Sequence, residues 1–181
     1  MQRAVITTSL FVLFCSFVLD VAAQGQAPKP GPEQKKLEAL LGSWTFEWDT
    51  KPSIFGPGGK VTGIERFQWM PGGFYLQMNR EAKTPTGDLR TLIVFGYDPI
   101  AKKHTGALFD NFGASELANI TINGNTWNWA GTGYSGDGKP FHERCTMAIS
   151  ANGTSSTLKC ELSSDGKTWS AFFEGRYTKS R

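Results

Sequence analysis

From Trp44 onward, apolar and polar residues alternate along the chain in short runs, separated by turns rich in glycine, proline and asparagine. Alternation with a period of two is typical of β-strands that bury one face. Before this region, Leu37, Leu40 and Leu41 recur at helical spacing, and Gly42 follows at the kind of position where helices commonly end. The pattern predicts one short helix over residues 33–41, followed by about ten strands.

The first long hairpin is predicted around residues 71–73. Its register gives one apolar face, and that face consists of Phe67, Trp69, Leu76 and Met78. Two residues further along the same face lie Glu65 and Arg80, opposite charges within reach of each other across the strands. One interpretation is an ion pair near a barrel rim, because charged groups are seldom fully buried. The other is a polar anchor inside a cavity.

A second hairpin is indicated by Asn123-Gly124, a strong two-residue turn signal. A turn at this dipeptide sets Ile120 opposite Trp127 and Ala118 opposite Trp129. Both tryptophans are therefore expected to face inward.

Two cysteines, Cys145 and Cys160, remain once the N-terminal apolar segment is set aside. A turn at Asn152-Gly153 places them directly opposite each other on the inner face. We therefore predict a disulfide, with Cα atoms roughly 5.5 Å apart as in a hydrogen-bonded antiparallel pair. Such a bond persists in an oxidising compartment.

The last hairpin is predicted at Asp165-Gly166, which sets Ala171 opposite Cys160 and Phe173 opposite Leu158 on that same inner face. Consecutive strands joined by tight turns indicate an antiparallel meander, and closing the meander removes its exposed edges. We expect an all-β fold, an antiparallel closed barrel of about ten strands with the short helix over one end. Barrels of this size have room for side chains and one small ligand.

The N-terminus reads as a signal peptide over residues 1–23, with Arg3, an apolar run and Val21-Ala22-Ala23 before the cleavage site. A flexible leader over residues 24–31 and one domain over residues 32–181 are expected to follow. The apolar run is too short to cross a bilayer comfortably, and no second run of that length follows. We expect export to the periplasm or the extracellular space, with no integral membrane segment in the mature chain.

Charge and motifs exclude several functions. The net charge is +3 with lysines scattered along the chain, which gives no support for nucleic-acid binding. Residues 131–136 match G-x-G-x-x-G, but no helix follows to hold a pyrophosphate. Neither His104 nor His142 is expected to face inward, so no metal or cofactor is expected. No catalytic motif is present, and Glu143 is the lone candidate for an inward acid or base.

A small, largely apolar ligand is therefore the leading functional expectation, and an acidic one would suit Arg80. The alternatives are a barrel enzyme acting on a small hydrophobic substrate and a structural domain with a solid core. The candidate ligand-binding residues share the predicted inner face: Trp44, Glu65, Phe67, Trp69, Leu76, Met78, Arg80, Trp127, Trp129, Glu143 and Phe173.

Residues 29–44, 55–60, 70–74 and 95–99 carry a family resemblance. Through them the chain resembles the secreted, mostly bacterial family catalogued as domain of unknown function 1579. The resemblance implies a lipocalin-like (calycin) barrel preceded by a helix, and it implies no established activity. Gly42-Ser43-Trp44 is also similar to the Gly-x-Trp opening of lipocalins, which cover that tryptophan with a late arginine. Arg176 is the candidate by position, although the register turns it outward.

Overall fold

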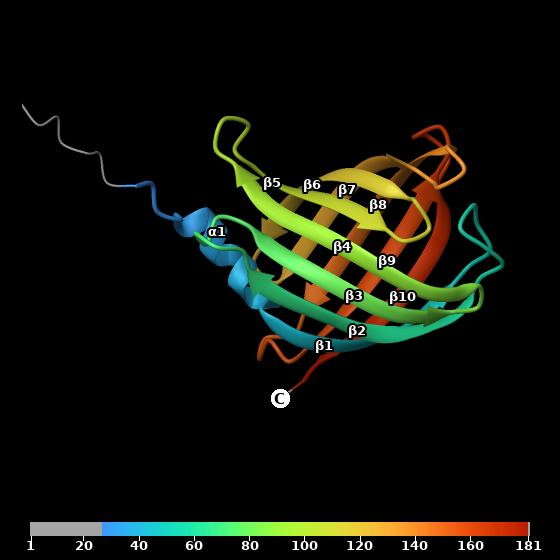
Figure 1. Cartoon of the computed structure of the whole chain (residues 1–181), viewed down its shortest axis with the longest axis horizontal. Helices are drawn as coiled ribbons and strands as arrows, with labels where there is room; N and C mark the ends of the chain where they lie inside the picture. The colour runs from blue at the N-terminus through green and yellow to red at the C-terminus, as the bar shows by residue number, and fades with distance from the viewer. Residues whose placement is uncertain (1–26, 181) are drawn as a thin grey trace, which may run out of the picture.

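The structure is a computed structural model that describes residues 27–180, so the predicted signal peptide lies outside the described residues. The described chain forms one short α-helix, one 3₁₀ turn and ten strands (Figure 1). The helical elements are α1 (Pro32–Lys36) and η1 (Leu37–Leu40). The strands are β1 (Gly42–Thr50), β2 (Gly59–Trp69), β3 (Leu76–Thr84), β4 (Gly87–Asp98), β5 (Lys103–Asp110), β6 (Ser115–Asn123), β7 (Thr126–Tyr134), β8 (Pro140–Ile149), β9 (Ser155–Ser163) and β10 (Ser170–Lys179).

These strands form a closed antiparallel barrel in which each strand pairs with the next along the chain. β1 also pairs with β10, from Trp44 opposite Lys179 to Thr50 opposite Phe173, and this pairing closes the barrel. The closed meander predicted from the sequence is confirmed. Closure leaves none of the ten described strands with an unpaired edge, and exposed edges favour aggregation.

The period-two pattern places alternate side chains inside the barrel. In β1, Trp44, Phe46 and Trp48 are buried, whereas Thr45 and Glu47 between them are exposed. The same alternation in the other strands builds one continuous apolar core. The inner face was predicted correctly where this alternation continues unbroken, and Ala171 and His104 are the exceptions described below.

The helix covers one end of the barrel, as expected, but only part of it is α-helical. α1 ends at Lys36, and Leu37–Leu40 form a 3₁₀ turn. In a 3₁₀ turn residues three apart lie on the same side, so Leu37 and Leu40 are both buried while Leu41 is only partly buried. Neither helical element is long and apolar enough to span a membrane.

Two of the predicted hairpins are present with a different residue pairing, and in the second the shift also changes the face of Ala171. In the β6–β7 hairpin the turn residues are Gly124 and Asn125, so Ile120 lies opposite Trp129 rather than Trp127. Gly124 has a φ of 57° at the first turn position, a conformation that glycine tolerates best. The shift is by two residues across the pair, which keeps both tryptophans inside.

The β9–β10 hairpin also departs from the predicted register. The Asp165 carboxylate accepts hydrogen bonds from two backbone N–H groups of its own loop at 2.8 Å, and this widens the turn beyond two residues. The register shifts again between Ala171 and Phe173. As a result Ala171 is exposed rather than inward, and Phe173 lies opposite Cys160 rather than Leu158.

The predicted disulfide is confirmed, since Cys145 and Cys160 are bonded and lie opposite each other on β8 and β9. Their Cα atoms are 4.2 Å apart. This is shorter than the predicted 5.5 Å and closer to the separation of a non-hydrogen-bonded pair.

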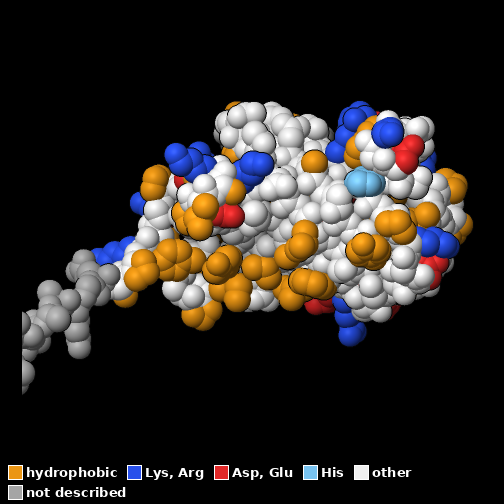
Figure 2. Space-filling view, turned by 90° about the horizontal axis from the view of Figure 1, so that it is seen from above, with side chains coloured by type: hydrophobic (Ala, Val, Ile, Leu, Met, Phe, Trp, Pro, Cys, Tyr) orange, Lys and Arg blue, Asp and Glu red, His pale blue; other side chains and the backbone are white. Residues whose placement is uncertain are grey.

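Several apolar side chains lie outside the barrel. Leu92, Phe109 and Leu117 are exposed on the outer face of β4, β5 and β6, with Leu92 directly opposite Phe109. Seen from above, apolar side chains form a row along the barrel surface (Figure 2). These side chains do not belong to the interior cavity described below.

Candidate ligand-binding cavity

A cavity of about 480 Å³ lies inside the barrel. At one end Leu40 of the 3₁₀ turn closes it, and at the other it reaches the loops around Lys51, Pro85 and Gly136. These loops join the strands at the end opposite the helix, so the cavity opens there. Its volume is within the range of cavities that hold one small molecule.

Eight of the sequence-predicted site residues line this cavity: Glu65, Phe67, Met78, Arg80, Trp127, Trp129, Glu143 and Phe173. Trp44, Trp69 and Leu76 are not among the lining residues. Trp44 and Leu76 are buried in the packed helix end of the barrel, where the Trp44 Nε1 donates a hydrogen bond to the Leu40 carbonyl oxygen at 2.8 Å. The ammonium of Lys179 lies 5.2 Å from the Trp44 ring centroid, while Arg176 is exposed.

Aromatic side chains gather at the mouth of the cavity. Phe55, in the loop between β1 and β2, lies 5.1 Å from Phe141 in an edge-on contact and 5.4 Å from Phe172, measured between ring centroids. Gly58 turns this loop back with a φ of 80°, and a Cβ there would collide with the backbone of Pro52. The loop therefore rests on the barrel through Phe55.

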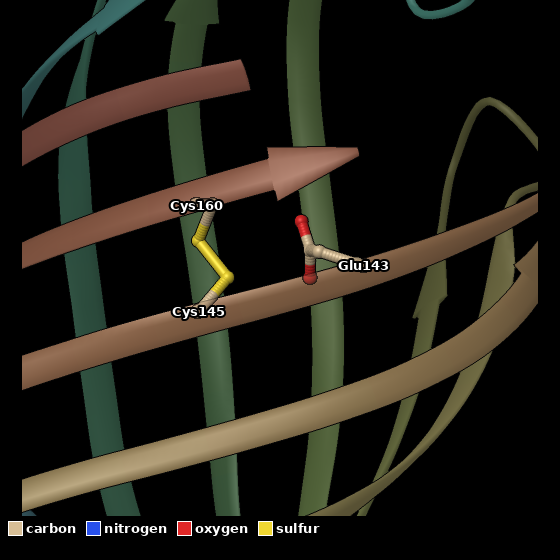
Figure 3. Close-up of side chains that lie close together, drawn as sticks. All are labelled: Glu143, Cys145 and Cys160. Atoms are coloured by element: carbon tan, nitrogen blue, oxygen red, sulfur yellow. A yellow bond between two sulfur atoms is a disulfide. The ribbon is translucent and has the colours of Figure 1, made fainter. Parts of the chain in front are cut away.

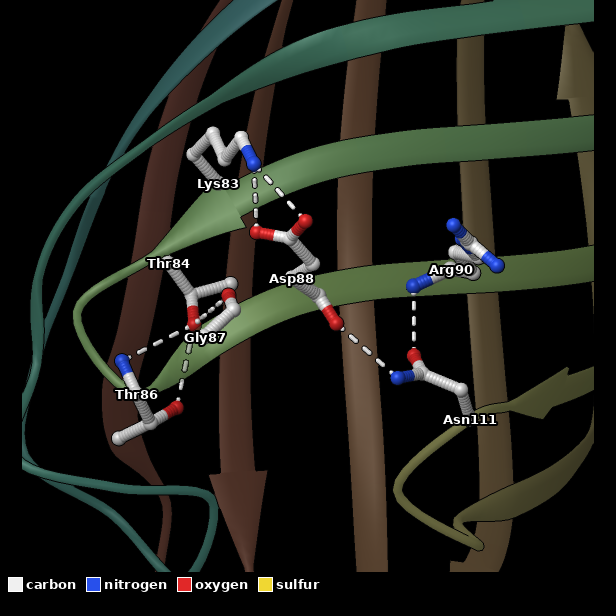
Figure 4. Close-up of polar contacts among 7 residues, drawn as sticks. All are labelled: Lys83, Thr84, Thr86, Gly87, Asp88, Arg90 and Asn111. Carbon is white, nitrogen blue, oxygen red and sulfur yellow. Dashed lines mark hydrogen bonds and ion pairs between the residues drawn. The ribbon is translucent and has the colours of Figure 1, made fainter.

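Polar contacts hold another part of the rim, shown in Figure 4. Asn111, in the loop between β5 and β6, donates to the Asp88 carbonyl oxygen at 3.0 Å and accepts from the Arg90 backbone N–H at 2.6 Å. The Asp88 carboxylate pairs with Lys83 at 2.7 Å. These contacts join the β3–β4 turn to the neighbouring loop and fix the shape of the opening on that side.

Inside the cavity, Arg80 and Glu65 form the predicted ion pair on neighbouring strands β3 and β2. Both Nε and Nη2 of Arg80 lie 2.8 Å from Oε1 of Glu65, and the two side chains are only 12% and 4% exposed. The guanidinium carbon is 4.5 Å from the centroid of the Trp48 ring. This pair is therefore buried and stacked, unlike the wet rim pair that was the alternative interpretation.

Tyr177 extends this cluster from β10. The Trp48 Nε1 donates a hydrogen bond to the Tyr177 hydroxyl at 2.9 Å. Burial raises the pKa of Glu65, while the Arg80 charge and hydrogen bonds from Arg80 and Tyr177 act in the opposite direction. Burial likewise raises the pKa of Tyr177. The cluster is a nearly neutral polar patch within an apolar wall.

Glu116 of β6 and Glu143 of β8 form a second polar pair, with β7 between their strands. Glu116 faces Gly133 of β7, and Gly131 of β7 faces Glu143 of β8. A Cβ at Gly131 would collide with the Glu116 carboxyl group, so the glycine leaves the space through which the two carboxyls meet. The two carboxyl groups are close enough to shift each other's pKa.

This arrangement favours the protonated form of the carboxyls. Burial, together with the charge of Glu143, raises the pKa of Glu116 to about 9. Burial also raises the pKa of Glu143, against hydrogen bonds from Glu116 and Trp129. Two carboxyls this close cannot both ionise readily, so the pair holds a proton near neutral pH. It can accept a hydrogen bond, donate one or exchange a proton with a bound molecule.

Figure 3 shows the Glu143 side chain beside the Cys145–Cys160 disulfide. One carboxylate oxygen and the two sulfur atoms lie within 4.8 Å of one another. Both sulfurs are in the disulfide, and metal binding by cysteine requires a thiolate. The oxidised cluster is therefore not a metal site.

His104 corrects the sequence interpretation, because it is buried on the inner face rather than directed outward. Its Nε2 lies 2.9 Å from the carbonyl oxygen of Glu33 in α1, and its ring packs 5.0 Å from that of Tyr97. The side chain is buried because the helix covers this end of the barrel. It does not line the cavity.

Sequence reasoning missed Glu116 and Tyr177. In this strand the sequence analysis places only Ala118 and Ile120 on a face, whereas β6 begins at Ser115 and includes Glu116. One usable signal was present. Glycine within a strand, as at Gly131, marks close approach of another group.

Comparisons with known proteins agree with this architecture. A family model described as "Protein of unknown function (DUF1579)" matches residues 29–179. No protein with a curated description matches the chain. The crystal structure of Rv2717c from M. tuberculosis is similar with a TM-score of 0.61 and 12% identity, over 83% of this chain and 99% of that one.

Two designed proteins give weaker similarity. A de novo designed fluorescence-activating β-barrel has a TM-score of 0.42 and 9% identity, over 79% of this chain and 95% of its own. EF1p2_mFAP2b bound to DFHBI has a TM-score of 0.43 and 12% identity, over 81% and 98% respectively. At 12% identity the similarity to Rv2717c bears on the fold alone.

Proposed function

We propose that this chain, which belongs to the family described as "Protein of unknown function (DUF1579)", binds a small, largely apolar molecule inside its barrel. The observation that carries the proposal is the cavity of about 480 Å³ that opens opposite the helix. Aromatic and aliphatic side chains make up much of its wall, and its buried charged groups lie in two clusters, Glu65–Arg80 and Glu116–Glu143. Such a combination is typical of sites for small molecules.

The competing solid-core interpretation is not supported by this interior. Side chains fill the helix end, where Leu37 and Leu76 are fully buried, but they leave the other part of the barrel open. Native interiors are close-packed, and voids larger than a few water molecules are uncommon in them. A void of this size with access to solvent therefore favours a binding role.

The test uses N-phenyl-1-naphthylamine, an uncharged dye whose emission rises in apolar surroundings. We expect saturable binding to the parent protein, and a loss of at least about tenfold in affinity for Ala118→Trp, whose side chain would occupy cavity space. Leu117→Trp is the matched control, because that neighbouring residue is exposed on the outer face. Equal binding by both variants, or no binding by the parent, would contradict the proposal.

We further propose that binding takes place after export. The supporting observations are the signal-like pattern of residues 1–23 and the disulfide, since disulfides are typical of oxidising compartments. N-terminal sequencing of protein recovered from outside the cytoplasm should begin at Gln24. A cytoplasmic chain with an intact Met1 and free thiols would refute export.

A further inference from the structure

The charges that line the cavity are unbalanced. Two lining residues are basic, Lys51 and Arg80, whereas five are acidic: Glu65, Asp110, Glu116, Asp137 and Glu143. Asp137 pairs with Lys139 at 2.6 Å, and Glu65 pairs with Arg80. The chain as a whole carries a net charge of +3, whereas acidic residues outnumber basic residues in the cavity wall. A cavity of this kind favours a positively charged guest.

The basic group within the barrel is already engaged. Arg80 holds Glu65 through two nitrogen atoms at 2.8 Å, and its guanidinium stacks on Trp48. A ligand carboxylate would have to displace Glu65, and Glu65 would then be left buried without its counter-charge. Breaking a buried ion pair in this way is unfavourable.

Within residues 27–180 no basic side chain forms an ion pair with Glu116 or Glu143, although the charge of Arg80 acts on Glu143. Glu116 is 6% exposed, and its Oε1 has no hydrogen-bond partner among the described residues. A buried acceptor without a donor is unfavourable, and donors are what the pair needs. The residues of the pair lie near the starts of β6 and β8, so the pair is at the mouth side of the cavity.

Together these observations identify the chemical group that is missing. We propose that the cavity takes an apolar molecule that carries a protonated amine, with the amine bound at the Glu116–Glu143 pair; this rests on the proposed binding function. The ammonium donates to the unpaired Glu116 oxygen and supplies the positive charge that two adjacent carboxyls favour. The apolar part of the molecule extends toward the aliphatic and aromatic wall around Phe67, Ile93 and Phe95.

The test compares three probes that share one naphthalene ring: 1-naphthylmethylamine, 1-naphthylmethanol and 1-naphthoate. Isothermal titration at pH 7 should give an affinity for the amine at least about tenfold above that for the alcohol, with the carboxylate weakest. Glu116→Gln should remove most of this preference while leaving the alcohol within about threefold of the parent. Glu174→Gln, on the outer face of β10, should change neither.

The possible outcomes distinguish failure of the amine assignment from failure of the proposed binding function. An alcohol bound as well as the amine would overturn the amine assignment and leave the binding function intact. Tightest binding of 1-naphthoate, lost in Arg80→Met, would overturn it in favour of an acidic ligand. If Glu116→Gln does not fold, Glu143→Gln and the three-probe ranking of the parent decide. If neither these probes nor the uncharged dye binds, both proposals fail.

Discussion

Replacing Arg80 by methionine removes the positive charge that faces Glu65 inside the barrel. The two side chains are 12% and 4% exposed, so solvent offers Glu65 little compensation. Loss of one partner from a buried ion pair typically costs about 3–5 kcal/mol. In a domain of this length, where 1 kcal/mol corresponds to about 2–4 °C, the melting temperature should fall by roughly 10 °C. The stacking of Arg80 on Trp48 is lost as well.

The same two strands provide a matched control. Arg66 and Glu81 form an ion pair at 3.1 Å on the outer face, with side chains 51% and 67% exposed. Arg66→Met should therefore change the stability by less than about 1 kcal/mol. The double variant Arg80→Met/Glu65→Gln should recover much of the loss, because it removes both buried charges.

Urea unfolding followed by tryptophan fluorescence, at pH 8 and at pH 5, measures these differences. The loss in Arg80→Met should be larger at pH 8. Burial already raises the pKa of Glu65, and removal of Arg80 raises it further, so the carboxyl is protonated more readily at pH 5. A loss at pH 8 no greater than that of Arg66→Met would show that the pair is solvated and that the reasoning is wrong.

Two further predictions concern the packing of the barrel. The Cys145–Cys160 disulfide closes a loop between residues 15 positions apart. The double variant Cys145→Ala/Cys160→Ala should therefore lower the free energy of unfolding by about 3 kcal/mol, measured by denaturant unfolding. An unchanged unfolding midpoint would contradict this. Leu37→Ala should cost about 2–5 kcal/mol because the Leu37 side chain of the 3₁₀ turn is fully buried, whereas Leu41→Ala should cost less because Leu41 is only partly buried. Equal losses would mean that the 3₁₀ turn does not dock as described.

The inner face of the barrel could be predicted because it depends on the parity of residue positions. A shift of two residues across a hairpin, as between Ile120 and its partner on β7, changes the partner but keeps the face. Glu65 and Arg80 were placed correctly for this reason. Ala171 was misplaced because the register shift before Phe173 changes the parity within β10.

The cavity and the Glu116–Glu143 pair could not be predicted in this way. Whether a barrel interior is filled or open depends on how strands tilt and how side chains from distant strands meet, and no local pattern reports either. Glu116 and Glu143 meet across β7 because Gly131 has no side chain. The sequence contains the glycine, but which group uses the space follows from the pairing of three strands. The burial of His104 likewise depends on where α1 docks.

From the raised pKa values of the Glu116–Glu143 pair we expect an unusual dependence of stability on pH. The pKa of Glu116 is raised to about 9 in the folded protein, mainly by burial and then by the charge of Glu143, against an ordinary value of 4.5. The folded state therefore binds more protons than the unfolded state between these values. Stability from this group is fully present below about pH 4.5 and is lost as the pH rises through about 9. The raised pKa values of Glu65 and Glu143 act in the same direction.

Other carboxyls act outside this range. Hydrogen bonds lower the pKa of Asp137 to about 2 and that of Asp165 further, so their contributions are lost only in more acidic solution. Melting temperatures of the parent should therefore decrease steadily from pH 5 to pH 9. Glu116→Gln, which is nearly isosteric and does not ionise, should give a shallower decrease and be the more stable form at pH 9, while Glu174→Gln should follow the parent. A parent curve that is flat or rises across this range would mean that the Glu116 carboxyl is ionised in the folded barrel, in contact with water or with a cation.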